Sequence, residues 1–470
     1  MTERSGKTGP ERIAPDFYES LDTAMLHYRA PKSLLSPRQV RALWSGLAAD
    51  IKTGRKQELL SIYVHVPFCA HRCKYCMYFS EEPGGPESVE RFLRDLLAEM
   101  AFMAPALKGV KVTHLYVGGG TPSTLSPEQL DRVLSGVFSL FKFGPTGERG
   151  LECHPLNMTP RHLAVIKKHG LNRVSFGVQT LNRRTLSRVN RDCQTWRDIV
   201  ALQGRLKRSG IPMLNIDLLL GLTKDTPAAF LDTADRVMKL GPGSISVHRL
   251  VPQPDYLRDF YGDDNARCVD DINRFARAVL PGLKRLADRH GFIFPDYDPS
   301  HYENRVYTML TPRYIKEFEK EPTGGYTIDN VHAYSVLGLG PSAKSNIFGY
   351  GLYHAEHSLR GGFSPDGKKM VFSRHGLKYE MLWHMVFSLD KHNNMVPGDY
   401  MRRAFAEDYL EVFRKPLAAL SKAGAITIKD GDLHLNYWTK KARFLIIMFL
   451  IRSASGRSAP DISGLGGGAR

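Results

Sequence analysis

The chain has few cysteines and no long apolar run. Only 6 of its 470 residues are cysteine, too few for the dense disulfide network of a small secreted scaffold. The longest apolar run, residues 444–451, is far shorter than the roughly 20 residues that a membrane-spanning helix needs. The first seven residues also lack the apolar core of a signal peptide. We therefore expect a cytoplasmic protein with reduced thiols and no membrane segment.

Motifs for nucleotides, zinc ribbons and nucleic acids are missing as well. The glycine run at 118–120 is neither G-x-G-x-x-G nor a P-loop, because no Gly-Lys-Ser/Thr follows it. There is no second C-x-x-C pair of the kind that zinc ribbons carry. The formal net charge is +17, but the basic residues are dispersed and form no arginine-rich arm. This charge favours anionic partners, and we do not expect nucleic acid among them.

Half of the cysteines lie close together. Cys69, Cys73 and Cys76 form the pattern C-x-x-x-C-x-x-C. Thiolates suit zinc or iron-sulfur clusters, both of which normally take four protein ligands. Three thiolates on a four-iron cluster would leave one iron open to a small molecule. The alternatives are a zinc site completed by His65 or His71, or a chance group of buried thiols.

Short β-branched runs alternate with amphipathic stretches from about Leu60 onward. The expected strands are 62–66, 112–117, 173–178, 213–219 and 244–250, and the expected helices that alternate with them are 90–103, 127–141, 160–169, 196–209 and 227–240. A further helix is expected near 36–52, before the first strand. Units at this spacing favour parallel strands joined by crossover helices. They suit an open barrel or a large doubly wound sheet, and in both the ligand site lies at the carboxyl ends of the strands.

Polar motifs fall at or just past the ends of these strands. The glycines of Gly118–Pro122 allow backbone groups to approach a ligand closely. A carboxylate such as Glu152 can bind ribose hydroxyls, and the forked guanidinium of Arg191 can pair with a carboxylate. For any one of these residues a structural hydrogen bond is the alternative. Their order along the chain favours a shared site.

Taken in order, these motifs resemble one branch of a known superfamily. Y-V-H-V-P-F-C-x-x-x-C-x-x-C, G-G-G-T-P, E-x-x-P, N-R-V-S-F-G-V-Q, N-R and N-I-D-L-L-L-G-L are similar to the oxygen-independent coproporphyrinogen oxidase-like (HemN-like) branch of the radical S-adenosylmethionine (SAM) enzymes. The resemblance runs from about Leu60 to Pro252. It continues more loosely through residues 334–345 and into a C-terminal domain from about Gly376.

This resemblance implies an α/β fold, namely a partial (β/α)6 radical SAM barrel with a mainly helical, winged-helix-like cap domain at the C-terminus. The expected organisation is an N-terminal segment at 1–57, the core barrel at 58–300, a linker and barrel-completing region at 301–375, the cap at 376–452 and a disordered tail at 453–470.

The resemblance also implies the cofactors and the residues that hold them. Cys69, Cys73 and Cys76 would bind a [4Fe-4S] cluster, and its open iron would bind SAM. With Tyr63, these cysteines form the expected catalytic set. The expected contacts of this SAM are Tyr63, Tyr75, Gly118, Gly119, Gly120, Thr121, Glu152 and Arg191. Gln179 and Asp217 match positions that bind a second SAM in the founding enzyme of the branch.

Departures from the branch narrow the expected reaction. The decarboxylating oxidase has a further cysteine two residues after the third ligand, where this chain has Tyr78. Its long N-terminal substrate-handling segment is not recognisable in residues 1–56. The haem chaperones carry His-Asn-x-x-Tyr-Trp, and this chain reads Ile-Asp-Asn-Val-His-Ala-Tyr-Ser at 328–335. By elimination we predict transfer of a methyl or methylene group from a second SAM to an unsaturated substrate, as in class C methylases.

Two alternative functions are kept beside this prediction. One is oxidative decarboxylation of a tetrapyrrole, and the other is haem binding without turnover, for which His332 is a candidate ligand. The expected partners are an unsaturated or tetrapyrrole-like small molecule and a reducing electron donor of the flavodoxin or ferredoxin type, and we expect a monomer. His248 and His301 are weaker candidates for proton transfer.

Overall fold

The computed structural model describes residues 32–55, 60–294, 306–319, 335–355, 359, 362–367, 369–391, 395–436, 440–454, 456 and 458–462. Contacts divide the chain into two units. One unit comprises Pro31–Glu380 with Arg403–Ala406, and the described residues of the other fall within Met381–Arg402 and Glu407–Arg470. The cysteine motif and the other predicted site residues all lie in the first unit.

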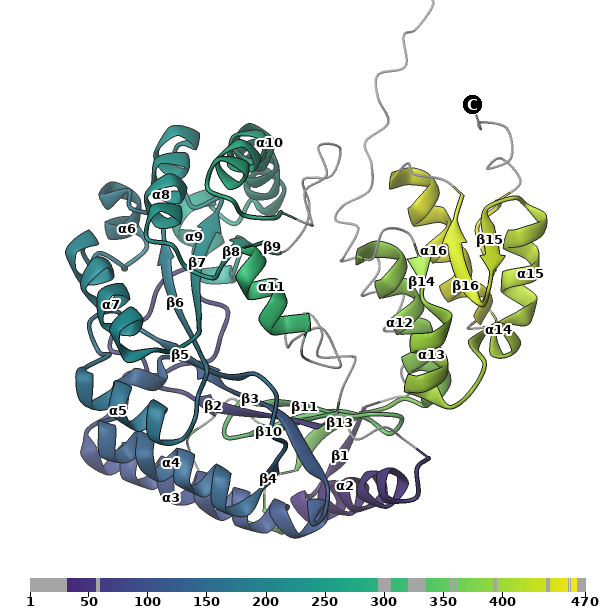
Figure 1. The fold of residues 1–470 in the computed structure, drawn as a ribbon, viewed down its shortest axis with the longest axis horizontal. Coiled ribbons are helices and arrows are strands. Elements are labelled where there is room, and N and C mark those ends of the chain that lie inside the picture. The colour runs from purple at the N-terminus through teal and green to yellow at the C-terminus, as the bar shows by residue number, and fades with distance from the viewer. Residues whose placement is uncertain are drawn as a thin grey trace, which may run out of the picture. The chain divides into compact units, whose positions relative to one another are not determined.

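The first unit is built on one large sheet (Figure 1). Its strands are β1 (Lys32–Leu35), β2 (Leu60–Val66), β3 (Lys111–Gly119), β4 (Lys142–Phe143), β5 (Arg149–Cys153), β6 (Arg173–Gln179), β7 (Met213–Leu220), β8 (Ser244–Arg249), β9 (Val306–Leu310), β10 (Ser335–Leu339), β11 (Lys344–Ile347), β12 (Gly351–His354) and β13 (Met370–Arg374). The strands β2, β3, β5, β6, β7 and β8 are parallel neighbours in this order. They are the six strands of the predicted partial barrel.

Further strands extend this parallel core at both edges. β9 pairs antiparallel with β8, and β10 pairs parallel with β2. Beyond β10, the antiparallel strands β11, β12, β13 and β1 complete the sheet. The N-terminal residues 32–35 therefore belong to the same sheet as residues 370–374.

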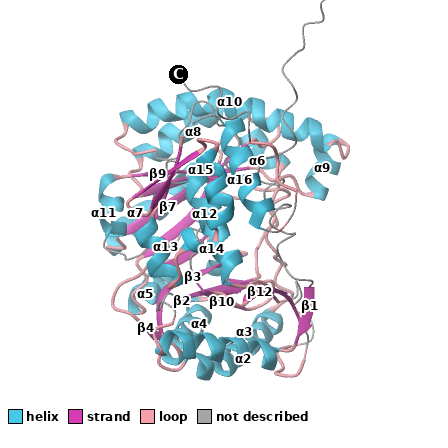
Figure 2. Cartoon of the chain, turned by 90° about the vertical axis from the view of Figure 1, so that its right-hand side faces the viewer, coloured by secondary structure: helices cyan, strands magenta, loops and turns pink. Residues whose placement is uncertain are grey.

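Helices cover the outer face of the parallel strands (Figures 1 and 2). They are α3 (Pro86–Met103), α4 (Pro127–Leu140), α5 (Pro160–Lys168), α7 (Trp196–Ser209), α8 (Pro227–Lys239) and α10 (Asn265–Arg289). The same unit also contains α2 (Pro37–Lys52), α6 (Arg183–Arg188), α9 (Pro254–Tyr261) and α11 (Pro312–Glu319). Local sequence fixes several of their starts. Ser36, Ser126 and Thr195 each accept a hydrogen bond from the third residue of the helix that follows, in reciprocal capping boxes.

Side chains alternate along the parallel strands between an apolar outer face and a polar inner face. In β2, Ile62, Val64 and Val66 are buried in the hydrophobic core. Tyr63 lies on the opposite face, in register with Tyr116 of β3, and their rings stack with centroids 6.4 Å apart. Because successive residues of a strand point to opposite faces, every second residue of each barrel strand reaches the inner face.

The second unit combines helices with a small antiparallel sheet. Its elements are the larger part of α12 (Leu377–Lys391), β14 (Met395–Val396), most of α13 (Gly398–Phe405), α14 (Tyr409–Val412), α15 (Arg414–Lys422), β15 (Ile426–Lys429), β16 (Asp432–Leu435) and α16 (Lys440–Ala454). The strand order is β14-β16-β15. Tyr409 donates a hydrogen bond to the carbonyl of Gly431 in the β15-β16 turn, at 2.9 Å.

The sequence predicted the fold class correctly. The structure also contains elements that the sequence did not predict. All five expected strands and all six expected helices are present, including α2 near 36–52, and α7 has the expected bounds. The strands β5 and β9 and the helices α6 and α10 were not predicted. The boundary between the two units falls inside α12, and the domain bounds expected from the sequence remain a prediction.

Some predictions lie outside the described residues. They concern residues 1–31 of the N-terminal segment, His301, His332 and residues 463–470 of the tail. Residues 453 and 454 of the expected tail are the last two of α16. Among the described residues, no helix is both long enough and apolar enough to cross a membrane.

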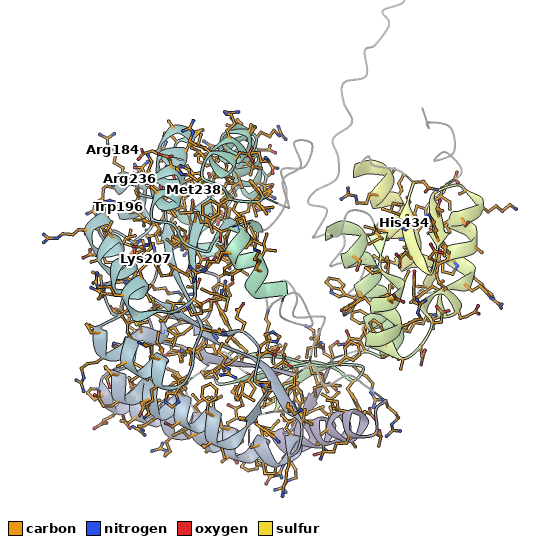
Figure 3. The ribbon with its side chains drawn as sticks, in the orientation of Figure 1. Arg184, Trp196, Lys207, Arg236, Met238 and His434 are labelled. Atoms are coloured by element: carbon orange, nitrogen blue, oxygen red, sulfur yellow. The ribbon has the colours of Figure 1, made fainter. Side chains whose placement is uncertain are left out.

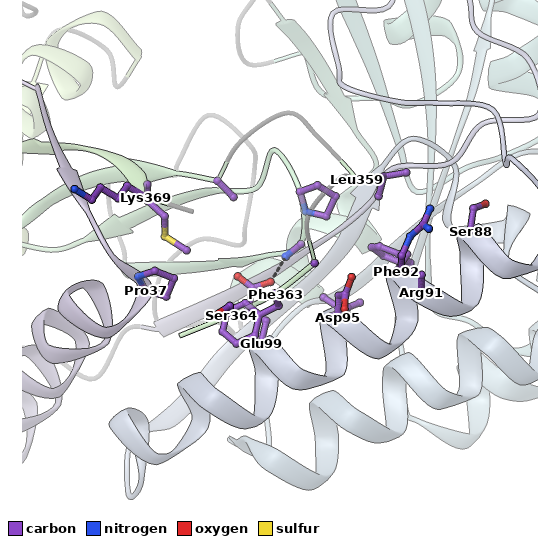
Figure 4. Close-up of a pocket in the computed structure, with 16 residues that line it drawn as sticks. Pro37, Ser88, Arg91, Phe92, Asp95, Glu99, Leu359, Phe363, Ser364 and Lys369 are labelled. Atoms are coloured by element: carbon purple, nitrogen blue, oxygen red, sulfur yellow. Dashed lines mark hydrogen bonds between the residues drawn. The ribbon is translucent and has the colours of Figure 1, made fainter. Parts of the chain in front are cut away.

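A buried carboxyl group fastens the sheet beside the cysteine motif. Glu99 of α3 is 9% exposed and accepts a hydrogen bond from the amide of Gly340 at 2.8 Å. Gly340 has φ of 93°, and a Cβ there would lie 2.7 Å from the carbonyl oxygen of His65. Glu99 therefore holds the turn after β10 against the end of β2. It also lines a mainly apolar cavity of about 110 Å³ that does not include the cysteines (Figure 4).

Replacing Glu99 with glutamine should stabilise the protein at alkaline pH. Burial raises the pKa of Glu99 from its ordinary value of 4.5 to about 7, so the folded state binds the proton more tightly than the unfolded chain. The contribution of this group to stability is therefore lost as pH rises from 4.5 to 7. Glu99→Gln should gain about 1–3 kcal/mol at pH ~8 and nothing at pH ~4.

Thermal or denaturant unfolding at the two pH values measures this difference. Glu87→Gln, at an exposed position on the same helix, is the matched control and should show no such pH dependence. An equal gain for Glu99→Gln at both pH values would contradict the expected linkage.

Candidate cluster and cofactor site

The cysteines lie on the loop of residues 67–85, which joins β2 to α3 and is called the cysteine loop below. Cys69 donates its backbone N–H to the carbonyl of Glu81, and Cys76 donates to Cys73, both at 3.1 Å. Lys74 donates to the carbonyl of Val189, just past α6, also at 3.1 Å. The loop is thus closed on itself and attached to the segment that follows β6.

The three thiols share one partly buried environment. The Sγ of Cys69 lies 3.4 Å from the hydroxyl of Thr121, and Arg191 donates to the Sγ of Cys73 at 3.5 Å. Burial raises the pKa of the Cys69 thiol, and it raises the pKa of Cys76 to about 11. The charges of the neighbouring cysteines raise both values further. The thiols are therefore close enough to interact electrostatically.

These residues fit a [4Fe-4S] cluster better than a single metal ion. Within the described part of the chain, no three His, Cys, Asp or Glu residues are arranged to hold one metal ion. A cubane cluster does not require that arrangement, because each thiolate binds a different iron. Soft donors, partial burial and the adjacent cation of Arg191 suit an electron-rich, thiolate-bound cluster.

Glu152 of β5 lies on the inner face, between β3 and the glycine motif. Tyr116 donates its hydroxyl proton to Oε1 of Glu152 at 2.7 Å, and the amide of Gly119 donates to Oε2 at 3.2 Å. Burial raises the pKa of Glu152 to about 7. The carboxyl group predicted to bind ribose is thus held in one orientation. Sequence reasoning missed Tyr116, although its place one strand away from Tyr63 is a usable signal.

The three glycines of the motif permit close packing around this carboxyl group and the cysteine loop. A Cβ on Gly118 would lie 2.9 Å from Oε2 of Glu152, and one on Gly120 would lie 2.6 Å from the carbonyl oxygen of Phe68. Gly119 has φ of 110°, and a Cβ there would lie 2.7 Å from the ring of His65. These positions need glycine for packing within the protein, and their contact with SAM remains a prediction.

Tyr63 and Tyr75 occupy different surroundings. The hydroxyl of Tyr63 lies 2.9 Å from Nδ1 of His65, whose Nε2 lies 2.9 Å from the carbonyl oxygen of Phe79. Through His65, Tyr63 is therefore connected to the cysteine loop. Tyr75 lies within that loop, and burial raises the pKa of its hydroxyl well above the ordinary value. Its environment includes the charge of Arg191.

Arg191 and Gln179 meet over a glycine at the end of β6. Arg191 donates to the carbonyl of Gly177 at 2.7 Å. A Cβ on Gly177 would overlap with Nε2 of Gln179 and lie 2.9 Å from Nη2 of Arg191. Gln179 has φ of 67° at a break in the β6-β7 register. A left-handed conformation in a non-glycine residue is costly and is often found at functional sites.

Asp217 belongs to a hydrogen-bonded network farther along the inner face. Asn215 donates to its Oδ1 at 2.6 Å and to the hydroxyl of Ser175 at 2.8 Å. The side-chain oxygen Oδ1 of Asn215 accepts from the hydroxyls of Ser244 and Ser246 at 2.8 and 3.1 Å. Ser175 also donates to the carboxylate of Asp217, at 3.2 Å. All hydrogen-bonding positions of the Asn215 amide are occupied, so the orientation of Asp217 is fixed.

The predicted residues thus form two groups, and contacts join the members within each group. One group links the cysteines through Arg191 to Gly177 and Gln179, and through Thr121 to the glycine motif. The other is the Asp217 network, with Nε2 of His248 3.6 Å from Oδ1 of Asp217. Cys153 and Cys268 are buried away from the loop, whereas Cys193 lies 3.7 Å from Nε2 of His154.

Cys73→Ala should prevent cluster assembly, whereas Cys193→Ala should not. Cys73 contacts Arg191 inside the cysteine loop, and Cys193 is a nearby thiol outside it. We expect at least a tenfold loss of bound iron and of charge-transfer absorption in Cys73→Ala, because even the loss of an outer-shell partner of a metal ligand lowers metal affinity about 10- to 100-fold. The measurement is anaerobic reconstitution followed by iron analysis. Equal iron content in the two variants would contradict the assignment of the loop.

Gly177→Ala should weaken SAM binding without unfolding the protein. The added methyl group meets the ends of two long side chains, Gln179 and Arg191, which can move away from it. We expect about a tenfold weaker affinity for SAM, on the scale of one displaced polar contact, with iron content unchanged. Titration calorimetry on the reconstituted protein measures it. Gly204→Ala, on α7, is the control and should bind SAM as the wild type does.

Comparisons with known proteins agree with this geometry. The model of the radical SAM superfamily matches residues 63–236. The oxygen-independent coproporphyrinogen III oxidase of Bradyrhizobium diazoefficiens is 32% identical over 199 residues, which are 42% of this chain and 44% of that protein. The haem chaperone HemW of Mycobacterium tuberculosis is 33% identical over 192 residues, which are 40% of this chain and 49% of that protein. The chain thus matches less than half the length of these two relatives.

A solved structure matches over a longer range. The coproporphyrinogen III oxidase HemN of Escherichia coli superposes with a TM-score of 0.67 and 23% identity over 87% of this chain and 92% of that chain. At this identity the likeness supports the fold. The family match and the cysteine loop identify residues 63–236 as a radical SAM domain, and the related oxidases make the chain similar to the oxygen-independent coproporphyrinogen III oxidase-like branch of that superfamily.

Proposed function

We propose that this radical SAM enzyme acts on an unsaturated, tetrapyrrole-like substrate and transfers to it a methyl or methylene group from a second SAM. The observation that carries the proposal is the Asp217 network. It holds the carboxylate of Asp217 in a fixed position on β7, in register with Gly177 of β6. The side chain of Gln179 packs over Gly177. A second set of oriented polar groups beyond Arg191 and Glu152 suits a second polar cofactor.

The residues near the cysteines suit the first SAM. A [4Fe-4S] cluster, when bound, supplies the electron and the open iron that radical SAM chemistry requires. Glu152, held by Tyr116 and Gly119, would accept hydrogen bonds from ribose hydroxyls. Arg191 would add positive charge beside the carboxylate of SAM while its Nη2 keeps the bond to Gly177. Positioning of the reacting groups is the main contribution of such residues.

The class of substrate follows from charge and from the relatives. Coproporphyrinogen and haem both carry carboxylates, which suit a chain of net charge +17. The relatives include a coproporphyrinogen oxidase and a haem chaperone. A tetrapyrrole also has the sp2 carbons that a carbon-transfer reaction needs.

Oxidative decarboxylation of a tetrapyrrole is the second candidate. It is favoured by the related oxidases. None of the relatives named above is a methyltransferase by name. Tyr78 argues against it, because the corresponding position is a cysteine in the oxidase. The two reactions leave different products, since carbon transfer yields S-adenosylhomocysteine and decarboxylation yields carbon dioxide.

An anaerobic assay with dithionite and SAM distinguishes the two candidates, with haem or coproporphyrinogen III as substrate. We expect 5'-deoxyadenosine in all reactions of the wild type, and S-adenosylhomocysteine when a tetrapyrrole is present. Asp217→Asn should lower the yield of S-adenosylhomocysteine about tenfold or more, because a hydrogen bond to a partly buried charged group is lost, and should retain 5'-deoxyadenosine. Asp263→Asn, at an exposed loop position, is the control.

Each contrary result has a definite meaning. Carbon dioxide without S-adenosylhomocysteine would replace carbon transfer with the oxidase reaction. Stable haem binding without any 5'-deoxyadenosine would replace both with a chaperone function.

A further inference from the structure

Arg173 is a buried cation on the inner face of the barrel. It is the first residue of β6, and its side chain is 12% exposed. Val174, Phe176 and Val178 of the same strand belong to the hydrophobic core, so Arg173 and Ser175 point to the inner face. Arginine stays charged in proteins, and taking a charge out of water is costly. The fold therefore fixes a positive charge inside the barrel, although sequence reasoning gave this residue no role.

One acidic side chain pairs with this cation. Nη1 of Arg173 donates to Oε1 of Glu148 at 3.1 Å, and the Glu148 side chain is 2% exposed. Glu148 directly precedes β5, and Arg173 begins β6. The pair thus lies at the amino ends of two neighbouring parallel strands, whereas the predicted contacts of SAM lie nearer to the carboxyl ends.

The ring of Tyr116 connects Arg173 with Glu152. The guanidinium carbon of Arg173 lies over this ring, 6.0 Å from its centroid, and the Tyr116 hydroxyl donates to Oε1 of Glu152 at 2.7 Å. Gly150 is in register with both Tyr116 and Arg173. A Cβ on Gly150 would lie 2.9 Å from Cδ2 of Tyr116, so glycine leaves the space that the ring occupies. A cation over an aromatic ring is attracted to it, and Arg173 therefore supports the residue that orients Glu152.

Charges on neighbouring strands act on the ionisation of Glu152 in opposite directions. Burial raises the pKa of Glu152 to about 7, and the hydrogen bond from Tyr116 limits this rise. The carboxylate of Asp217 raises the pKa further, whereas the charge of Arg173 lowers it. Other titratable groups near these residues are Tyr63 of β2, His114 of β3, Glu148, Cys153 of β5, His248 of β8 and Tyr314 of α11. Arg173 thus opposes the effects of burial and of Asp217.

We propose that Arg173 is a positioning residue for SAM, which acts through Tyr116 and keeps Glu152 charged and oriented to accept hydrogen bonds from the ribose hydroxyls. This inference rests on the proposed function, in which Glu152 binds the ribose of the first SAM. Hydrogen bonds to a charged acceptor are about twice as strong as those between neutral groups. The positive charge acts on SAM indirectly, since the ring of Tyr116 separates Arg173 from Glu152.

A purely structural role for the ion pair is the competing explanation. A pair that merely fastens β5 to β6 would change SAM binding equally at every pH, or not at all. A role through Glu152 makes the effect depend on pH, because a positive charge favours the ionised carboxylate over the neutral carboxyl group.

Removal of the whole pair tests the proposal. The variant Arg173→Gln/Glu148→Gln removes both buried charges, so neither is left without its partner. The matched control is Arg236→Gln/Asp232→Asn on α8. There, Arg236 pairs with Asp232 at 3.8 Å and lies over the ring of Trp196, 4.3 Å from its centroid. Figure 3 labels Arg236 and Trp196 on the outer helices. Arg173→Lys keeps the positive charge. SAM binding to the reconstituted protein is measured by calorimetry from pH ~6 to ~9, across the ordinary range of a raised carboxyl pKa.

We expect the midpoint of the pH dependence of SAM affinity to rise by about one pH unit in Arg173→Gln/Glu148→Gln, because a nearby opposite charge is lost. SAM should then bind about fivefold more weakly at pH ~7 and nearly as tightly as in the wild type at pH ~9. The control variant and Arg173→Lys should keep the wild-type midpoint. The amino group of SAM titrates alike in all these proteins, so it does not affect the comparison.

Carbon-13 NMR of the full chain, labelled at the carboxyl carbons of glutamate, measures the ionisation of Glu152 without SAM and without activity. The variant Glu152→Gln identifies the resonance. The pKa of Glu152, about 7 in the wild type, should be higher in Arg173→Gln/Glu148→Gln and unchanged in the control variant.

Glu148→Gln alone gives the opposite sign and is the second test should the double variant not fold. Without the Glu148 carboxylate, the charge of Arg173 is no longer neutralised, so the pKa of Glu152 and the midpoint of SAM binding should fall. A midpoint that rises or stays in place would contradict the proposal.

Other results also decide the matter. An equal loss of SAM affinity at every pH, or an unchanged pKa of Glu152 in the double variant, would leave the pair with a structural role and overturn the proposal. Absence of 5'-deoxyadenosine with dithionite and SAM would instead refute the proposed function, while the NMR measurement still decides whether Arg173 controls the ionisation of Glu152.

Discussion

The candidate site depends on the alternation of side chains along the six parallel strands. Apolar residues such as Ile62 and Val64 pack beneath the helices, and this burial holds the sheet in its curved form. The residues between them are thereby directed to the inner face, where Tyr63, Tyr116 and Glu152 meet. The hydrophobic effect thus places the polar chemistry without any direct attraction among the polar groups.

Local signals explain why much of the fold was predictable. Short β-branched runs identified most of the parallel strands, and the amphipathic stretches between them identified helices such as α4 and α7. The strand β5 was missed because it is short and contains Gly150 and Glu152, which depart from a β-branched pattern. The strands β1, β9 and β10 pair over long sequence separations, as Lys32 of β1 does with Ser373 of β13. Local sequence carries no information about such a pairing.

The sequence predicted which residues belong to the candidate site better than it predicted the contacts between them. The cysteine spacing and the order of the motifs identified Arg191, Glu152 and Asp217. The roles of Tyr116 and Asn215 emerged only from three-dimensional contacts, because tyrosine and asparagine are common in strands and turns for other reasons. Gly177 belongs to the N-R-V-S-F-G-V-Q motif, but only the side chains of Gln179 and Arg191 above it reveal why glycine is required there.

The Asn215 network has a consequence for how the barrel receives ligands. Its amide is bonded to four neighbours from β6, β7 and β8, so these dipoles satisfy one another within the protein. The hydrogen bonds of this part of the inner face are therefore complete before a cofactor binds. Its electric field is set during folding, and little reorganisation energy is required when a charged molecule enters.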